Sequence, residues 1–188
     1  MYNKLREVNV IYKKPKIDTL RVLILLPLPY RAAMNSLFLQ MAYSYLNMFE
    51  NVYAERGWID NSYRITSAET STPLKKFDIV LTSLSYELDY IDFIRTLIES
   101  NINPYSEKRS NEDPLIVVGG IAPTANPEPI ADIADVIVIG DAEEFLGKLV
   151  EIGKENKRRL LDYLEAVSYT HLRAHETSLH LVCRLLLE

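Results

Sequence analysis

The stretch VVGGIAPTANPEPIADIADVIVIGDAEEF, residues 117–145, decides the fold. It contains two short apolar runs that each end in glycine, and a segment with three prolines separates them. Short apolar runs of this kind are typical of strands buried on both faces of a parallel sheet. Glycine allows a neighbouring group to approach the backbone closely. The two strand ends therefore raise the question of what lies against them.

Strand and helix signals alternate along the rest of the chain. Strands are predicted at residues 19–27, 52–55, 77–85, 114–120 and 136–140, helices at 34–48, 88–98 and 145–152, and a long polar connection at 57–76. This alternation predicts an α/β domain with helices on both faces of a parallel sheet. We expect a flavodoxin-like (Rossmann-like) three-layer sandwich whose five-stranded parallel sheet has the order 2-1-3-4-5.

Composition narrows the class of protein. The chain has 188 residues, of which 48% are hydrophobic, and this suffices for one domain with a sizeable core. Its net charge of -5 argues against a nucleic-acid partner. No apolar run approaches the roughly 18 residues that a membrane span needs, and the start MYNKLREVNVIYKKPK lacks the apolar centre of a secretory signal. The single cysteine excludes a disulfide within the chain, so a cytoplasmic protein is expected.

The last segment, VSYTHLRAHETSLHLVCRLLLE at residues 167–188, contains all three histidines and the one cysteine. One interpretation is a metal site that uses His171 and His175, four residues apart on a helix, with Cys183 nearby. The other is that VSYTHLRAHET and LVCRLLL resemble a translated sequencing-library adapter. We favour the adapter, predict that residues 167–188 are not native, and leave them out of the fold and the function.

Small or rigid residues gather where the predicted strands end. They are Pro29 and Tyr30 after the first strand, Ser83, Leu84 and Ser85 after the third, Gly119 and Gly120 after the fourth, and Gly140 and Asp141 after the fifth. Carboxyl ends of parallel strands meet at one edge of the sheet, where ligands bind. A single glycine often serves only to turn the chain, but four such strand ends together favour a groove along this edge.

The ligand of this groove is not expected to be a simple nucleotide. The helix after the fifth strand begins with Asp141 as its cap and Glu144 in its first turn, a capping-box pattern. These carboxylates occupy the positive end of the helix, where a phosphate would otherwise bind. The chain also lacks the motifs G-x-G-x-x-G and G-x-x-x-x-G-K-[ST]. Glu87 and Asp89 are interpreted as a solvated helix start.

Three segments together resemble the amino-terminal cobalamin-binding-like (B12-binding-like) domain of radical S-adenosyl-L-methionine (radical SAM) proteins. They are LPLPYRAAMNSLFLQMAYSYLN, PLKKFDIVLTSLSYELDYIDFI and VVGGIAPTANPEPIADIADVIVIGDAEE, and the similarity runs from about Arg21 to Ala166. The pattern GG-x-x-P-T-x-N-P-E-P, followed by a strand and G-[DE]-x-E, is specific in combination. The resemblance implies an N-terminal extension (1–18), the cobalamin-binding-like domain (19–155) and a helical linker (156–166). We expect the chain to be cut short at this linker, before the catalytic barrel of the same full-length protein.

The resemblance also implies roles for the strand-end residues. Ser83 and Ser85 would line the slot for the nucleotide tail of cobalamin, Gly119 and Gly120 would let the tail pass close to the backbone, and Gly140 and Asp141 would close the far side. Pro29, Tyr30 and Leu84 would lie along the same edge. Residues 1–166 contain no histidine and no D-x-H-x-x-G motif, so no imidazole from them can bind cobalt. Ala142 stands where the family pattern has a glycine.

This chain alone is not expected to be catalytic. A radical SAM enzyme holds its 4Fe-4S cluster with three cysteines, usually as C-x-x-x-C-x-x-C, and residues 1–166 contain none. The cluster and S-adenosylmethionine are therefore expected only in the C-terminal domain. Two alternatives to cobalamin binding stay open. One is a cobalamin-free domain that docks on the barrel or presents substrate, and the other is an unrelated flavodoxin-like ligand-binding domain such as a flavin carrier.

Overall fold

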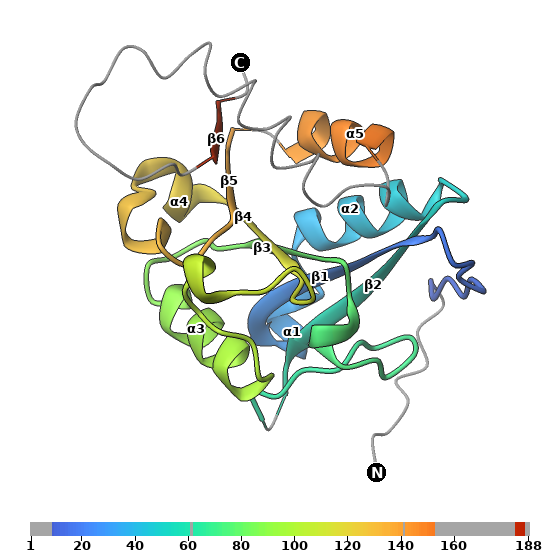
Figure 1. Ribbon diagram of the computed structural model, residues 1–188, viewed down its shortest axis with the longest axis horizontal. Coiled ribbons are helices and arrows are strands. Elements are labelled where there is room, and N and C mark those ends of the chain that lie inside the picture. Colours follow the sequence, from blue (N-terminus) through green and yellow to red (C-terminus); the bar gives the residue numbers. More distant parts are fainter. Residues whose placement is uncertain (1–8, 61, 141, 153–182, 187–188) are drawn as a thin grey trace.

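A parallel sheet with helices on both faces forms the molecule (Figure 1). The computed structural model describes residues 9–60, 62–140, 142–152 and 183–186. In them the strands are β1 (Leu20–Pro29), β2 (Val52–Ile59), β3 (Ile79–Ser83), β4 (Leu115–Gly119), β5 (Val136–Ile139) and β6 (Cys183–Leu186). The sheet order is β2-β1-β3-β4-β5-β6, and all the pairings are parallel. The first five strands and their order confirm the predicted flavodoxin-like arrangement.

The helices divide into two layers. They are α1 (Tyr30–Ala33), α2 (Leu37–Asn47), α3 (Asp89–Glu99), α4 (Ile121–Ala125) and α5 (Ala142–Ile152), with short 3-10 turns at Leu74–Lys76, Ser106–Lys108 and Glu128–Ile130. Residues of α2 and α5 pack on one face of the sheet, and residues of α3 and α4 pack on the other. No helix in the described part of the chain has the length and apolar character that crossing a membrane requires.

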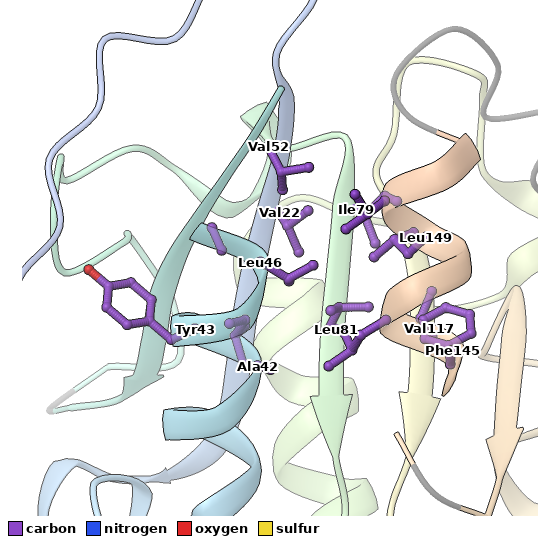
Figure 2. Packing of buried hydrophobic residues seen from close by; sticks show 14 of the residues in the cluster. Val22, Ala42, Tyr43, Leu46, Val52, Ile79, Leu81, Val117, Phe145 and Leu149 are labelled. Atoms are coloured by element: carbon purple, nitrogen blue, oxygen red, sulfur yellow. The ribbon is translucent and has the colours of Figure 1, made fainter. Parts of the chain in front are cut away.

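Each strand feeds both layers because successive side chains point to opposite faces. On β3, Ile79 and Leu81 join the α2/α5 layer, whereas Val80 joins the α3/α4 layer. Figure 2 shows the first layer, with Leu46 of α2 and Leu149 of α5 directed at the strands. Full burial of one such side chain stabilises the fold by about 1.5–3 kcal/mol. Burial on both faces explains why the strands are continuous apolar runs.

β2 is longer than the sequence predicted, and its extra length includes charged residues. It was expected at residues 52–55 but continues to Ile59, and both Glu55 and Arg56 are buried. The cause is residues 66–73 of the connection to β3, which cover this outer strand. Ser67 Oγ and Thr70 Oγ1 each donate to a Glu55 carboxylate oxygen at 2.6 Å. The charges are therefore satisfied within the protein, as buried charges must be.

The same connection closes the free edge of the sheet. The backbone N–H of Arg56 donates to Glu69 Oε2 at 2.8 Å, and the backbone oxygen of Arg56 accepts from Ala68 N at 2.8 Å. The guanidinium of Arg56 also pairs with Glu69 Oε1 at 2.7 Å. An outer strand with unpaired backbone groups invites pairing with another chain. Because Glu69 accepts the hydrogen bond of the Arg56 backbone N–H, that group is not available to pair with another chain.

We predict that Glu69→Ala lowers the free energy of unfolding by about 3 kcal/mol, since it leaves buried donors of Arg56 without their acceptor. Burial raises the pKa of Glu69 above its ordinary value, although the hydrogen bonds and charge of Arg56 oppose the rise. Glu69→Gln keeps an acceptor oxygen for the donors of Arg56 but removes the charge opposite its guanidinium, so it should cost less than Glu69→Ala, about 2 kcal/mol. Urea denaturation measures both. Glu99→Ala on the exposed end of α3 is the control, and an equal loss for all three variants would contradict the assignment.

β6 lies within residues 167–188, the segment that was not included in the fold prediction. Its residues Cys183 to Leu186 pair in register with Val136 to Ile139 of β5. The physical reason is that β5 has an open edge whose backbone groups accept a further strand. His171, His175 and His180 lie outside the described residues, as does the predicted linker at 156–166.

We predict that deleting residues 167–188 changes the melting temperature by no more than about 2 °C, because β6 is a four-residue strand paired on one side only. Thermal unfolding followed by circular dichroism measures the change. A fall large enough to unfold the domain at room temperature would show that the segment is part of the native fold.

Candidate functional site

A cavity of about 490 Å³ opens at the carboxyl edge of the sheet, between α2 and α5. Its walls are Leu37, Phe38 and Met41 from α2 and Phe145 and Leu146 from α5. Leu81, Val117 and Val138, from three neighbouring strands, form its floor. The cavity therefore lies on the α2/α5 face of the sheet, at the edge where the sequence predicted a groove.

The hollow arises from a change in side-chain size along β3 and β4. Leu81 and Val117 fill the space under the helices, and Figure 2 shows Phe145 close to them. Two residues further along the same face come Ser83 and Gly119, which are paired across the two strands. These small residues leave unfilled the space that larger side chains occupy deeper in the layer. The cavity is thus a direct consequence of where the small residues stand.

The structure brings four of the predicted site residues together. Ser83, Gly119, Gly120 and Gly140 all line the cavity. Among the described residues, the hydroxyl of Ser83 makes no hydrogen bond, so it is available to a ligand. Asp141 lies outside the described residues.

Four other predicted residues do not line the cavity. Leu84 is fully buried in the α3/α4 layer, because the alternation of side chains along the chain turns it to the opposite face. Ser85 is exposed beyond it. Pro29 is exposed at the end of β1, and the ring of Tyr30 packs on Trp58 with 5.1 Å between centroids. A ligand-binding role for these four stays a prediction.

The two adjacent glycines serve different purposes. Gly120 has φ 107° and ψ 179°, a conformation essentially restricted to glycine. A Cβ atom there would lie 2.5 Å from the backbone oxygen of Leu84, so the fold itself requires this glycine. At Gly119 the nearest atom to a Cβ would be Val138 O at 3.5 Å, an ordinary contact. Gly119 is therefore the glycine that keeps space open without being needed by the backbone.

We predict that Gly120→Ala lowers the free energy of unfolding by about 3 kcal/mol or more, through backbone strain and the clash with Leu84. Gly119→Ala should change it by less than about 1 kcal/mol, because alanine fits and is not disfavoured in a strand relative to glycine. Urea denaturation of the ligand-free proteins compares the two. Equal losses would show that both glycines are structural.

The electrostatics of the cavity disfavour a buried anion. Among the described residues that line it, Glu143, which is exposed, is the one that is ionisable. A phosphate inside would meet no compensating cation and would pay a large desolvation penalty. Within the described residues, no group of three His, Cys, Asp or Glu side chains could hold a metal ion.

One acidic residue near the edge has a structural role that the sequence analysis did not predict. Glu87 is exposed, as expected for a solvated helix start, but Asp89 is buried. Its Oδ2 accepts hydrogen bonds from the backbone N–H groups of Ser85 at 3.0 Å and Tyr86 at 3.1 Å. Asp89 thereby fixes the loop between β3 and α3.

Sequence reasoning missed the walls of the cavity. Leu37, Phe38 and Met41 were recognised only as one apolar face of a helix, and Phe145 and Leu146 only as another. The available signal was the contrast between these large side chains and the small residues at the strand ends. It could be used only with the knowledge that α2 and α5 lie on the same face.

Comparison with known proteins gives one family and one curated relative. The family described as "Radical SAM proteins, N-terminal" matches residues 39–172. The uncharacterized protein MJ0966 of Methanocaldococcus jannaschii is 25% identical over 122 residues, which cover 65% of this chain and 24% of that protein. The chain thus spans about a quarter of the length of the relative. No solved structure gives a significant match.

Proposed function

The chain belongs to the family of N-terminal domains of radical SAM proteins, and from this premise we propose that it is the cobalamin-binding part of a radical SAM enzyme. The observation that carries the proposal is the cavity at the carboxyl edge of the sheet, lined by Ser83, Gly119, Gly120 and Gly140. Ligands of open parallel sheets bind at this edge. The catalytic barrel would follow in the full-length protein.

The residues of the cavity suit the benzimidazole base at the end of the nucleotide tail of cobalamin. That base is flat and apolar, and the cavity has apolar walls from two helices and an apolar floor from three strands. Its volume of about 490 Å³ lies within the usual range for small-molecule sites. The hydroxyl of Ser83 is the polar group that would orient the tail.

The charged part of the tail fits only outside the cavity. The described residues of the lining include no cation, and Glu143 is the one ionisable residue among them. We therefore expect the base to enter the cavity and the phosphate to stay in solvent, where it needs no partner. Gly119 would lie beside the entering base, because its missing side chain is what leaves the space.

Residues 1–166 contain no histidine to bind cobalt and no cysteine to hold an iron–sulfur cluster. Bound cobalamin would supply radical or alkyl-transfer chemistry at its cobalt. The role of this domain is then to hold the cofactor by its tail, while the 4Fe-4S cluster and S-adenosylmethionine belong to the catalytic domain.

A second candidate function is a cobalamin-free domain that docks on the barrel or presents substrate to it. One observation favours it: the glycine at position 120 is explained by its contact with Leu84 without any ligand. A family pattern that includes this glycine is therefore compatible with a domain that has lost the cofactor. Binding measurements separate the two candidates.

We predict that hydroxocobalamin, followed by its visible absorbance, binds the chain and that Gly119→Leu weakens binding by about tenfold or more. The leucine side chain would project into the cavity and fill the space for the base, which costs at least about 1.4 kcal/mol of binding free energy. Circular dichroism first verifies that the variant is folded.

The matched control is Ala125→Leu, which also introduces a leucine but at an exposed position of α4. It should leave the affinity unchanged. Equal binding by both variants would place cobalamin elsewhere, and no binding by the parent chain would favour the cobalamin-free domain.

A further inference from the structure

Four large apolar side chains stand exposed together at the carboxyl edge of the sheet, on the side of α3 and α4. They are Tyr86 and Leu88 in the loop after β3, Ile91 in the first turn of α3, and Ile121 at the start of α4, and each is between 64% and 76% exposed. We call them the apolar rim patch. Single exposed apolar residues are ordinary, but a cluster of them marks an interaction site.

The patch belongs to a rigid part of the fold. Asp89 accepts hydrogen bonds from Ser85 N and Tyr86 N, and the backbone N–H of Ile91 donates to Leu88 O. The two segments that carry the patch are joined, since Leu84 N donates to Gly119 O at 2.8 Å and Ala122 N donates to Leu84 O at 3.2 Å. The four side chains are thus presented from one fixed surface, at little entropic cost of ordering on binding.

The core does not need these residues. The buried positions of the same segments are Leu84, Tyr90, Phe93 and Ala122, and they already fill the α3/α4 layer. The four exposed side chains point away from that layer. Their apolar surface is therefore left for a contact outside the described part of the chain.

We propose that the apolar rim patch is the surface on which the catalytic domain of the same full-length protein docks. The chain belongs to a family of N-terminal domains, and it spans only 24% of its relative MJ0966, so a longer partner segment in the same protein is expected. This proposal rests on the family membership and does not depend on cobalamin binding.

The size of the patch favours a tethered partner over a second copy of the chain. Stable association of free proteins needs about 800 Å² of buried surface on each partner, some 20 residues or more. Four side chains provide far less. A domain joined by a linker is present at millimolar effective concentration, so a small apolar contact suffices. An anionic lipid surface is disfavoured by the net charge of -5 and by Glu87, which is exposed within the patch.

Hydroxyl-radical footprinting of cobalamin-free protein tests the proposal. The reactivity of Tyr86, Leu88, Ile91 and Ile121 should fall by about tenfold in the full-length gene product relative to the 188-residue chain, because interface cores lose contact with solvent. Tyr12 and Ile17, which are exposed in the N-terminal segment, serve as reference side chains whose reactivity should not change.

Variants make the test specific. In the full-length protein, Leu88→Ser combined with Ile91→Ser should return Tyr86 and Ile121 to the reactivity of the isolated domain. Tyr12→Ser combined with Ile17→Ser, at positions that are also exposed, should leave them protected. Circular dichroism of the 188-residue chain with each pair shows that the domain is folded.

Three outcomes would overturn the proposal. The first is equal reactivity of the patch in the two proteins, or a gene that ends without a further domain. The second is protection that appears in the 188-residue chain as its concentration rises, which indicates self-association. The third is protection only when cobalamin is added, which assigns the patch to the cofactor. Failure of cobalamin to bind leaves the expected protection unchanged, so the two proposals fail separately.

Discussion

The close contact between Gly120 and Leu84 is the constraint on which the carboxyl edge of this domain depends. Leu84 bonds to Gly119 through its N–H and to Ala122 through its oxygen, and Gly120 must lack a side chain for the two segments to meet. This contact continues the pairing of β3 and β4 beyond their last ladder residues, Ser83 and Gly119. It places the cavity on one face of the sheet and the apolar rim patch on the other.

Side-chain alternation then gives neighbouring residues different functions. Ser83 faces α2 and α5 and lines the cavity, Leu84 faces α3 and α4 and is buried, and Tyr86 stands exposed beyond the sheet. The sequence prediction treated the consecutive residues after the third strand as parts of one site. The pleat of the strand separates them, because residues one apart point to opposite faces.

The elements that could be predicted from the sequence are those whose signal is local. Apart from β2, the five strands are largely apolar runs, so their existence and order followed from burial on both faces and from right-handed crossovers. The extension of β2 through Glu55 and Arg56 could not be predicted, because it depends on Ser67, Thr70 and Glu69 in a distant connection. α4 was missed because it has five residues, too few for helical periodicity to show.

For the candidate site, the strand-end residues could be predicted from the sequence, but the cavity walls could not. Four of the strand-end residues meet in the cavity because carboxyl ends of parallel strands share an edge. Its walls depend on the placement of α2 and α5 on one face, which is a property of the tertiary fold. The different roles of the two glycines could also be assigned only from the structure. A Cβ atom at Gly120 would clash with Leu84, whereas one at Gly119 would make only an ordinary contact with Val138.

On the proposed function, a domain of this kind would contribute to a reaction by holding the reacting groups in position. Residues 1–166 contain neither a histidine nor a cysteine, yet the carboxyl edge combines an apolar cavity with a fixed apolar surface. Both features are held by the same short segments at the ends of β3 and β4, so a displacement of one would move the other. If the cavity holds the tail of a cofactor and the patch holds the catalytic domain, the distance between cofactor and catalytic centre is set by this rigid edge. Rigid placement of reacting groups is the means by which a protein without catalytic side chains can still accelerate a reaction.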